Sequence, residues 1–240
     1  MTNNLNNIQI VLVEPQSSEN IGAVCRAMKT MGISKLSIVG KTIYDSGKIK
    51  NLSVHSYEVY ENSKRFDNLK KALENSVLSA GTTRRTGKKR KYISVSPEEL
   101  SRKTSSIKSG EISIVFGRES SGLTSEELEE CNIAVTIPSS PDSPSLNLAQ
   151  AVQVITYSIY SSNFNGIGYT PVTSKRMKQV IDTISYSLEK LNFFKKNEKK
   201  ELEQFFNDIF SRAGISQTES VRIEKIFTKI FRIKINKNID

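Results

Sequence analysis

Three polar loops with small residues follow apolar segments of the chain, and together they could hold a ligand. They read AGTTRR at 80–85, FGRESSGL at 116–123 and IPSSPDSPSLNL at 137–148. In an open parallel sheet, ligands bind beyond the carboxyl ends of the strands. Gly117 and Gly122 let a backbone come close to a ligand, and prolines stiffen the third loop. Each loop alone is also typical of an ordinary turn, but the three together predict a ligand site at one sheet edge.

An arginine within a short helical segment is a second candidate for chemistry. The segment ENIGAVCRAMKTMG at 19–32 carries an apolar stripe at helical spacing, made of Ile21, Val24, Cys25, Met28 and Met31. Gly22 and Arg26 lie one turn apart on the opposite face, with Ala23 and Thr30. Because glycine inside a helix costs roughly 1 kcal/mol relative to alanine, we expect another group to approach Gly22 closely and to meet Arg26. An ordinary exposed arginine is the alternative interpretation.

Several common kinds of active site have no counterpart in the sequence. Neither a G-x-G-x-x-G fingerprint after the first apolar segment nor a P-loop motif occurs. The chain has a single histidine, His55, which argues against serine or cysteine catalysis with a histidine base. The acidic run that starts the segment at 125–131 is interpreted as a solvated helix face, made of Glu126, Glu127, Glu129 and Glu130.

The cysteines and the hydropathy of the chain indicate the cellular compartment of the protein. Cys25 and Cys131 both lie in segments patterned as core, and no metal-ligand spacing exists. No apolar run approaches the roughly 18 residues of a membrane span, and the first residues, MTNNLNNIQI, lack signal-peptide features. The sequence therefore predicts a reduced cytoplasmic protein with no metal and no membrane association.

The balance of charge favours a polyanionic partner. The 240 residues hold 35 lysines and arginines against 25 aspartates and glutamates, a net charge of +10. Six of the basic residues fall within the 11 positions of GTTRRTGKKRK at 81–91, namely Arg84, Arg85, Lys88, Lys89, Arg90 and Lys91. Such clustering is typical of a segment that binds nucleic acid.

The order of elements predicts an α/β fold with a mostly parallel sheet and helices on both faces. Strands are expected at 8–13, 35–40, 76–81, 112–117 and 132–138, and helices at 65–75, 124–131 and 146–160.

The composition changes after residue 160, so we assign 1–160 to one domain, 161–175 to a linker and 176–240 to a small helical domain. Its helices are expected at 175–192, 198–212 and 219–231, the last with a capping box at Ser216 and Glu219. An aromatic core is expected from Phe193, Phe194, Phe205, Phe206, Phe210, Phe227 and Phe231.

Three motifs in this order resemble the SPOUT class of RNA methyltransferases, in its SpoU/TrmH-type 2′-O-ribose branch. They are ENIGAVCRAMKTMG at 19–32, ISIVFGRESSGLTSEEL at 112–128 and IPSSPDSPSLNLAQAVQV at 137–154. The resemblance covers about residues 8–160 and is specific because all three motifs occur together. Within this branch the chain is most similar to enzymes that methylate cytidine or uridine 32 in the tRNA anticodon loop.

The resemblance implies a trefoil-knotted sheet, a homodimer with sites at the subunit interface, S-adenosyl-L-methionine as cofactor and tRNA as substrate. It implies a cofactor site made of Thr82, Thr83, Arg84, Gly117, Ile137, Ser145, Leu146 and Asn147. Arg26 matches the family's catalytic arginine, Ser145 is expected to help position the ribose, and Glu119 to hold the site together. RNA binding is expected from Asn20, Arg85, Lys88, Lys89, Arg90 and Lys91.

Three alternatives stay open at this point. The same fold could methylate another tRNA position or ribosomal RNA. The chain could also be a catalytically silent RNA-binding protein, which the presence of Arg26 and all three loops argues against. A dinucleotide-dependent oxidoreductase is disfavoured because the glycine fingerprint is missing.

Overall fold

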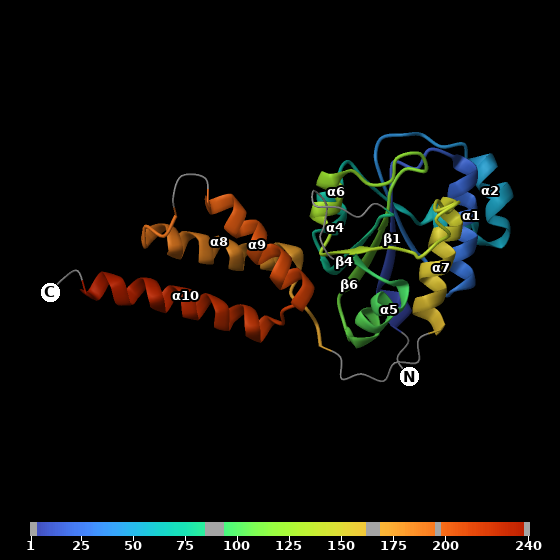
Figure 1. Ribbon diagram of the computed structural model, residues 1–240. Coiled ribbons are helices and arrows are strands. Elements are labelled where there is room, and N and C mark those ends of the chain that lie inside the picture. The colour runs from blue at the N-terminus through green and yellow to red at the C-terminus, as the bar shows by residue number, and fades with distance from the viewer. Residues whose placement is uncertain (1–3, 85–93, 162–168, 195–197, 238–240) are drawn as a thin grey trace. The chain divides into compact units, whose positions relative to one another are not determined.

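The computed structural model describes residues 4–84, 94–161, 169–194 and 198–237 (Figure 1). The chain divides into two compact units, Met1–Tyr169 and Thr170–Asp240, and each is described by itself. The assignment of 161–175 as a linker between domains at 1–160 and 176–240 stays a prediction.

The first unit is built on a parallel seven-stranded sheet in the order β3-β2-β1-β6-β4-β7-β5. The strands are β1 (Ile8–Val13), β2 (Lys35–Val39), β3 (Lys64–Phe66), β4 (Ser76–Thr82), β5 (Ser94–Val95), β6 (Glu111–Phe116) and β7 (Ile133–Val135). The α/β class and the five expected strands are confirmed. The edge strands β3 and β5 escaped prediction because neither has an apolar run: β3 is KRF with two exposed residues, and β5 has only two residues. The helix expected at 65–75 is wrong in its first part: Arg65 and Phe66 belong to β3, and the helix begins only after Asn68.

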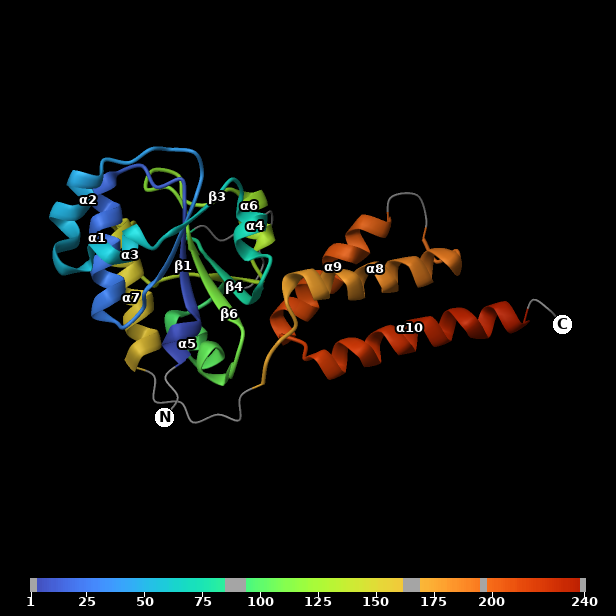
Figure 2. The ribbon, with the colours of Figure 1, turned by 180° about the vertical axis from the view of Figure 1, so that it is seen from behind.

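Helices cover both faces of this sheet, as Figures 1 and 2 show. They are η1 (Asn4–Asn7), α1 (Ser18–Thr30), α2 (Ser46–Ser53), η2 (Val54–Ser56), α3 (Tyr57–Glu61), α4 (Leu69–Leu73), α5 (Pro97–Ser106), α6 (Ser125–Glu130) and α7 (Leu148–Ser161). Side chains of β1 alternate between two cores, as expected for a strand. Ile10 and Leu12 join the core under α1, α2, α5 and α7, whereas Val11 and Val13 join the core under α4 and α6.

Helix α1 has the predicted apolar stripe but a different partner on its small face. Ser17 caps its N-terminus by accepting from the Asn20 N–H, and Ile21, Val24, Cys25 and Met28 are fully buried. The group that approaches Gly22 is α2: a Cβ at Gly22 would lie 2.5 Å from the carbonyl oxygen of Ile49. The close approach expected at Gly22 is therefore made by a helix of the same chain, and this helix-to-helix contact fills the space beside the glycine. Burial raises the pKa of Cys25 to about 12.

Strand β7 lies between β4 and β5, two strands that precede it in the chain. It is bonded on both sides near its end, because the Thr83 N–H donates to Val135 O (2.8 Å) and the Thr136 N–H donates to Val95 O (3.0 Å). A knot depends on the course of residues 85–93, which lie outside the described residues. The trefoil knot stays a prediction.

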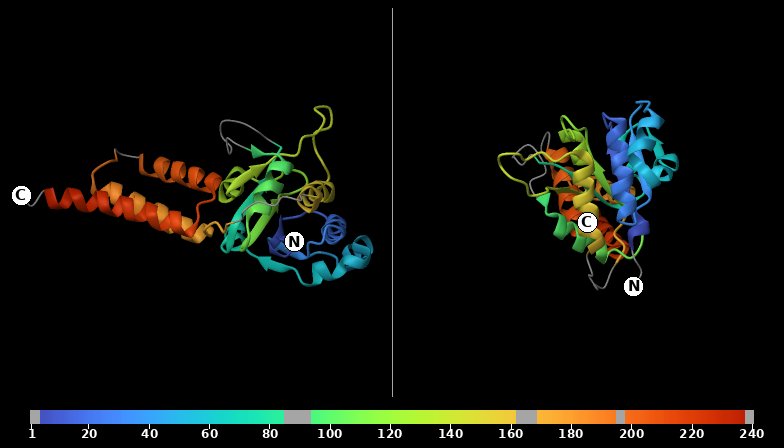
Figure 3. Two further views of the ribbon diagram at one scale, coloured as in Figure 1. Left: turned by 90° about the horizontal axis from the view of Figure 1, so that it is seen from below. Right: turned by 90° about the vertical axis from the view of Figure 1, so that its right-hand side faces the viewer.

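The second unit contains α8 (Ser174–Lys190), α9 (Glu198–Ala213) and α10 (Gln217–Lys237), with α8 packed on both others (Figure 3). The Ser216 and Glu219 capping box is present at the start of α10. Arg176 and Glu224 join α8 to α10 through two hydrogen bonds of 2.7 and 2.5 Å. The predicted aromatic core is correct only in part: Phe206, Phe210 and Phe227 pack in it, whereas Phe193 and Phe205 are 61% and 55% exposed. Phe205 and Phe206 are consecutive on α9 and cannot both face one core, and Phe193 lies beyond the end of α8.

Two further observations concern absent features. None of the helices in the described ranges is long and apolar enough to cross a membrane. Among the same residues, no cluster of histidine, cysteine, aspartate or glutamate could hold a metal ion.

Replacing Gly22 with alanine should destabilise the first unit although alanine favours helix. The new Cβ would meet backbone of α2, which cannot move independently of the core. We expect the free energy of unfolding to fall by about 1 to 3 kcal/mol, measured by urea denaturation. The matched control is Gly47→Ala, where the nearest atom is a movable carboxylate oxygen of Asp45 at 3.2 Å. Equal effects of the two changes would contradict the packing argument.

Candidate active site

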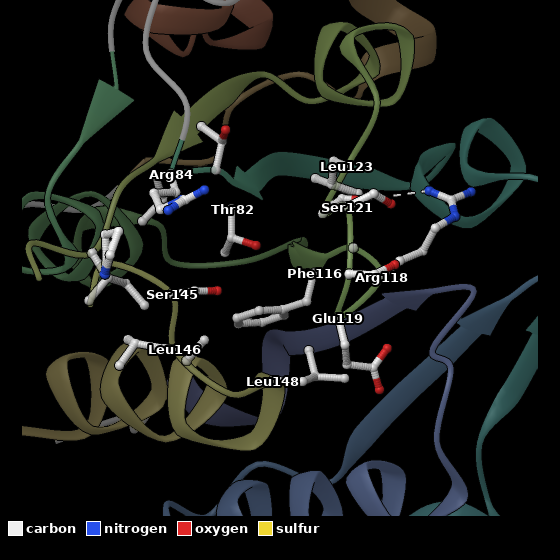
Figure 4. A pocket seen from close by; sticks show the side chains of 18 residues that line it. Thr82, Arg84, Phe116, Arg118, Glu119, Ser121, Leu123, Ser145, Leu146 and Leu148 are labelled. Atoms are coloured by element: carbon white, nitrogen blue, oxygen red, sulfur yellow. Dashed lines mark hydrogen bonds between the residues drawn. The ribbon is translucent and has the colours of Figure 1, made fainter. Parts of the chain in front are cut away.

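The three predicted loops meet in one cavity of about 170 Å³ at the carboxyl edge of the sheet (Figure 4). It is lined by Thr82, Thr83, Arg84, Phe116, Gly117, Arg118, Glu119, Ser120, Ser121, Gly122, Leu123, Val135, Ile137, Pro144, Ser145, Leu146, Leu148 and Ala151. Strands β4, β6 and β7 are neighbours in the sheet and run in parallel, so the loops that follow them leave the same edge.

The predicted site residues divide into three groups. Seven of the eight expected cofactor residues line the cavity: Thr82, Thr83, Arg84, Gly117, Ile137, Ser145 and Leu146. Asn147, Asn20 and Arg26 are not part of the lining. Arg85, Lys88, Lys89, Arg90 and Lys91 lie outside the described residues.

The inner wall of the cavity is apolar and its edge is polar. The Phe116 ring lies between Thr82 and Leu148 in Figure 4, and Ile137 and Leu146 belong to the same lining. The Thr82 hydroxyl donates to Val115 O at 3.0 Å, which fixes its orientation. Apolar surfaces joined to a few placed polar groups suit a flat heterocycle with a polar edge. Phe116 and Leu148 were not predicted here because they read as core residues; their place at the strand end and the helix start is the signal that could have found them.

The loop at 117–123 turns back on itself directly beyond β6. A Cβ at Gly117 would lie 2.2 Å from the carbonyl carbon of Gly122, so only glycine fits there. The Gly122 N–H donates to Arg118 O at 2.8 Å, and Gly122 has a φ of +69°. The close backbone approach predicted at Gly117 is therefore to its own loop, which forms one wall of the cavity.

Arg118 ties this loop to two other segments. Its guanidinium donates two hydrogen bonds of 3.0 Å to Glu127 of α6 and lies 2.8 Å from a carboxylate oxygen of Glu14. Its side chain is 19% exposed, and the two carboxylates raise the pKa of the guanidinium further. Glu14 follows β1 with a φ of +45°, a strained value for a side chain other than glycine. Glu127 also completes the capping box of α6 with Thr124, so the interpretation of Glu127 as part of a solvated face is wrong.

Glu119 links its loop to Gln16 and to the first turn of α1 through its two carboxylate oxygens. One oxygen accepts from the Asn20 Nδ2 at 2.8 Å, and the other accepts from the Gln16 backbone N–H at 2.8 Å. Asn20 Oδ1 in turn accepts from the Asn147 Nδ2 at 3.0 Å. The three sequence motifs are thus joined by side-chain hydrogen bonds at the cavity.

Arg26 lies on the exposed side of α1, one to two turns after Asn20. Its backbone carbonyl accepts from the Thr30 hydroxyl at 2.8 Å. Within the described ranges its guanidinium makes no hydrogen bond or ion pair, so it is available to a partner outside this chain. Neighbouring side chains on α1 are buried under α2 and α7.

Comparisons with known proteins agree with this geometry. The model of the SpoU rRNA Methylase family matches residues 7–157. A Methanocaldococcus jannaschii protein named tRNA (cytidine-2′-O-)-methyltransferase TrmJ is 30% identical over 226 residues, which cover 92% of this chain and 98% of the relative. A Pectobacterium atrosepticum protein named tRNA (cytidine/uridine-2′-O-)-methyltransferase TrmJ is 40% identical over 156 residues, 65% of this chain and 64% of the relative. The crystal structure of TrmJ from Z. mobilis has a similar fold, with a TM-score of 0.73 at 22% identity, and covers 92% of this chain and 98% of that chain.

Replacing Arg118 with glutamine should loosen the loop at 117–123. The change leaves the half-buried Glu127 without its two charged donors. A polar group in the interior that loses its partner costs about 1 to 3 kcal/mol, so we expect the free energy of unfolding to fall by about 2 kcal/mol. Urea denaturation measures it, with Arg102→Gln on the exposed surface of α5 as control. A loss no larger than that of the control would contradict the role of Arg118.

Proposed function

Because the chain belongs to the SpoU methylase family, we propose that it transfers a methyl group from S-adenosyl-L-methionine to a ribose 2′-hydroxyl of tRNA. The position we propose is cytidine or uridine 32 of the anticodon loop, acted on by a cytoplasmic homodimer. The observation that carries the proposal is one cavity at the sheet edge that is lined by the second and third family motifs, with Asn20 of the first motif hydrogen-bonded to both. The names of the two TrmJ relatives support tRNA as the substrate and the ribose of a pyrimidine nucleotide as the methylated group.

The residues of the cavity fit the proposed cofactor. Ile137, Leu146 and Phe116 offer apolar surface to an adenine ring, and the loop at 117–123 adds polar groups to the lining. Glu119 belongs to the same lining. When bound, the cofactor supplies the electrophilic methyl group.

Arg26 is proposed to act on the ribose. A guanidinium has a pKa above about 12 and is a poor proton acceptor near neutral pH. It can instead orient the hydroxyl and a neighbouring phosphate, and it can stabilise negative charge that develops on the attacking oxygen. Ser145, which is exposed in the cavity lining, is proposed to position the ribose.

Arg26 does not line the cavity of its own chain, but in a homodimer it could reach the cavity of the partner subunit. Helices α1 and α7 lie side by side on one face of the sheet, as Figures 1 and 2 show. The outer face of α7 exposes Val154 (36%) and Tyr157 (58%), which are apolar enough to be covered by a second copy. We therefore propose that this face forms the dimer and that each cavity receives Arg26 from the partner subunit.

Basic residues outside the cavity are proposed to bind the RNA backbone. The cluster from Arg85 to Lys91 directly follows the cavity residues Thr82 to Arg84 in sequence. If this cluster and the second unit neutralise about six phosphates, the salt dependence of tRNA affinity should have a log–log slope of about −4 to −5. The same chemistry at another tRNA position or in ribosomal RNA is the second candidate, since the matching family is named for rRNA.

The Arg26→Ala variant tests the reaction and the role together. The assay follows methyl transfer to unmodified bulk tRNA, with nuclease digestion and mass spectrometry to locate the product. We expect 2′-O-methylation at position 32 by the native protein, a loss of at least 100-fold in Arg26→Ala, and nearly unchanged calorimetric affinity for S-adenosylhomocysteine. Arg102→Ala, on the exposed surface of α5, is the charge-matched control. Methylation elsewhere would overturn the position, and a large loss of cofactor affinity would overturn the role of Arg26.

Mixed dimers test whether Arg26 acts across subunits. Leu146→Glu should block the cofactor cavity, and Arg26→Ala should remove the catalytic group, so each homodimer is inactive. A co-expressed and separately tagged heterodimer contains one cavity with both an intact Leu146 and a partner's Arg26. We expect it to recover about half of the native activity. A heterodimer as inactive as the two homodimers would show that Arg26 serves its own chain's cavity.

A further inference from the structure

We propose that Glu119 is a positioning residue that sets the orientation of the Asn20 side-chain amide and, through it, the position of the loop at 137–148. This inference rests on the proposed function, because the loop it positions is the one proposed to hold the cofactor. The sequence of contacts from Glu119 through Asn20 to Asn147 is called the amide relay below.

The amide relay has a defined direction. An ionised carboxylate only accepts hydrogen bonds, and Glu119 receives two donors, the Gln16 N–H and the Asn20 Nδ2, both at 2.8 Å. Asn20 must therefore turn its nitrogen toward Glu119, which leaves its Oδ1 free to accept from the Asn147 Nδ2 at 3.0 Å. Reversing the Asn20 amide would place donor against donor at Asn147 and acceptor against acceptor at Glu119.

Asn147 passes this constraint to the cofactor loop. Its Oδ1 accepts from the Ala149 N–H at 2.9 Å at the start of α7, and its own N–H donates to Gln150 Oε1 at 3.1 Å. The two residues before it, Ser145 and Leu146, line the cavity. Asn147 is exposed and is not itself part of the lining, so the bond that its side chain donates to Asn20 is what connects it to Glu119 in the cavity wall.

The amide relay also connects the cavity to α1. Asn20 lies in the first turn of α1, less than two turns before Arg26, and Glu119 lies in the cavity wall. Gln16 reinforces the connection, because its Oε1 accepts from the Ser120 N–H at 2.9 Å. Glu119 thus holds the helix that carries Arg26 and the loop that carries Ser145 in one arrangement, without itself touching the ribose.

The order of donors and acceptors along the amide relay can be tested by exchanging the carboxylate and the amide between positions 119 and 20. Glu119→Gln keeps the shape but turns an amide nitrogen toward either Asn20 or Gln16, where a donor already stands. Asn20→Asp places two carboxylates side by side. The double variant Glu119→Gln/Asn20→Asp restores all three bonds: the new glutamine accepts from Gln16 and donates to the new aspartate, which still accepts from Asn147.

The expected result is a strong coupling between the two changes. Each single variant should bind S-adenosylhomocysteine at least 10-fold more weakly by calorimetry and methylate tRNA at least 10-fold more slowly at saturating cofactor. The double variant should recover both values to within about 3-fold of native. The matched control is Glu129→Gln on the exposed face of α6, outside the cavity, which should behave as native. Silent single variants, or a double variant whose loss equals the product of the two, would overturn the amide relay.

Unfolding midpoints of the same four proteins separate the amide relay from the proposed function. If the native protein neither binds S-adenosylhomocysteine nor methylates RNA, the proposed function has failed. The relay is then judged by the thermal double-mutant cycle alone. Recovery of the midpoint in the double variant supports the bonds, and additive losses overturn them. Native-like midpoints in the single variants together with weakened binding would assign to Glu119 a positioning role rather than a role in stability.

Discussion

All the strands of the sheet run in one direction, and this common direction is the constraint on which the site depends. Parallel pairing brings every carboxyl end to the same edge, so loops that follow β1, β4, β6 and β7 emerge together. Segments as far apart in sequence as Asn20 and Asn147 are therefore hydrogen-bonded at 3.0 Å. The helices on both faces bury the strands and leave this edge as the place where polar loops can gather.

Once gathered, the loops are held by a small number of oriented polar contacts. Arg118 joins the loop at 117–123 to Glu14 and Glu127, and Glu119, its neighbour in sequence, joins the same loop to Gln16 and Asn20. Adjacent side chains thus point to opposite sides of the loop. One secures the wall to α6 and the end of β1, and the other secures it to α1. A cavity built in this way is shaped before any ligand binds, which lowers the entropic cost of binding.

The second unit carries much of the positive charge of the chain, and none of its described residues belongs to the cavity lining. Its 71 residues from 170 to 240 hold 15 lysines and arginines against nine aspartates and glutamates, the larger part of the net charge of +10. Its three helices need their own core, which Met177, Val180, Ile184 and Phe210 provide. An excess of positive charge of this size favours a polyanionic partner.

The amino-acid pattern by itself determined the α/β class, the strands β1, β2, β4, β6 and β7, the stripe of α1 and the loops that line the cavity. These follow from local periodicity and from the rule that parallel strands share an edge. It also pointed to the family, because three motifs occur in one order. Only the tertiary structure decided what fills the space beside Gly22, that Gly117 faces its own loop, and that Glu127 pairs with Arg118. It alone showed that Arg26 stands outside the cavity and that Asn147 reaches Asn20. The physical reason is that periodicity tells which face of an element is buried, whereas the identity of the group on the other side depends on segments far away in the chain.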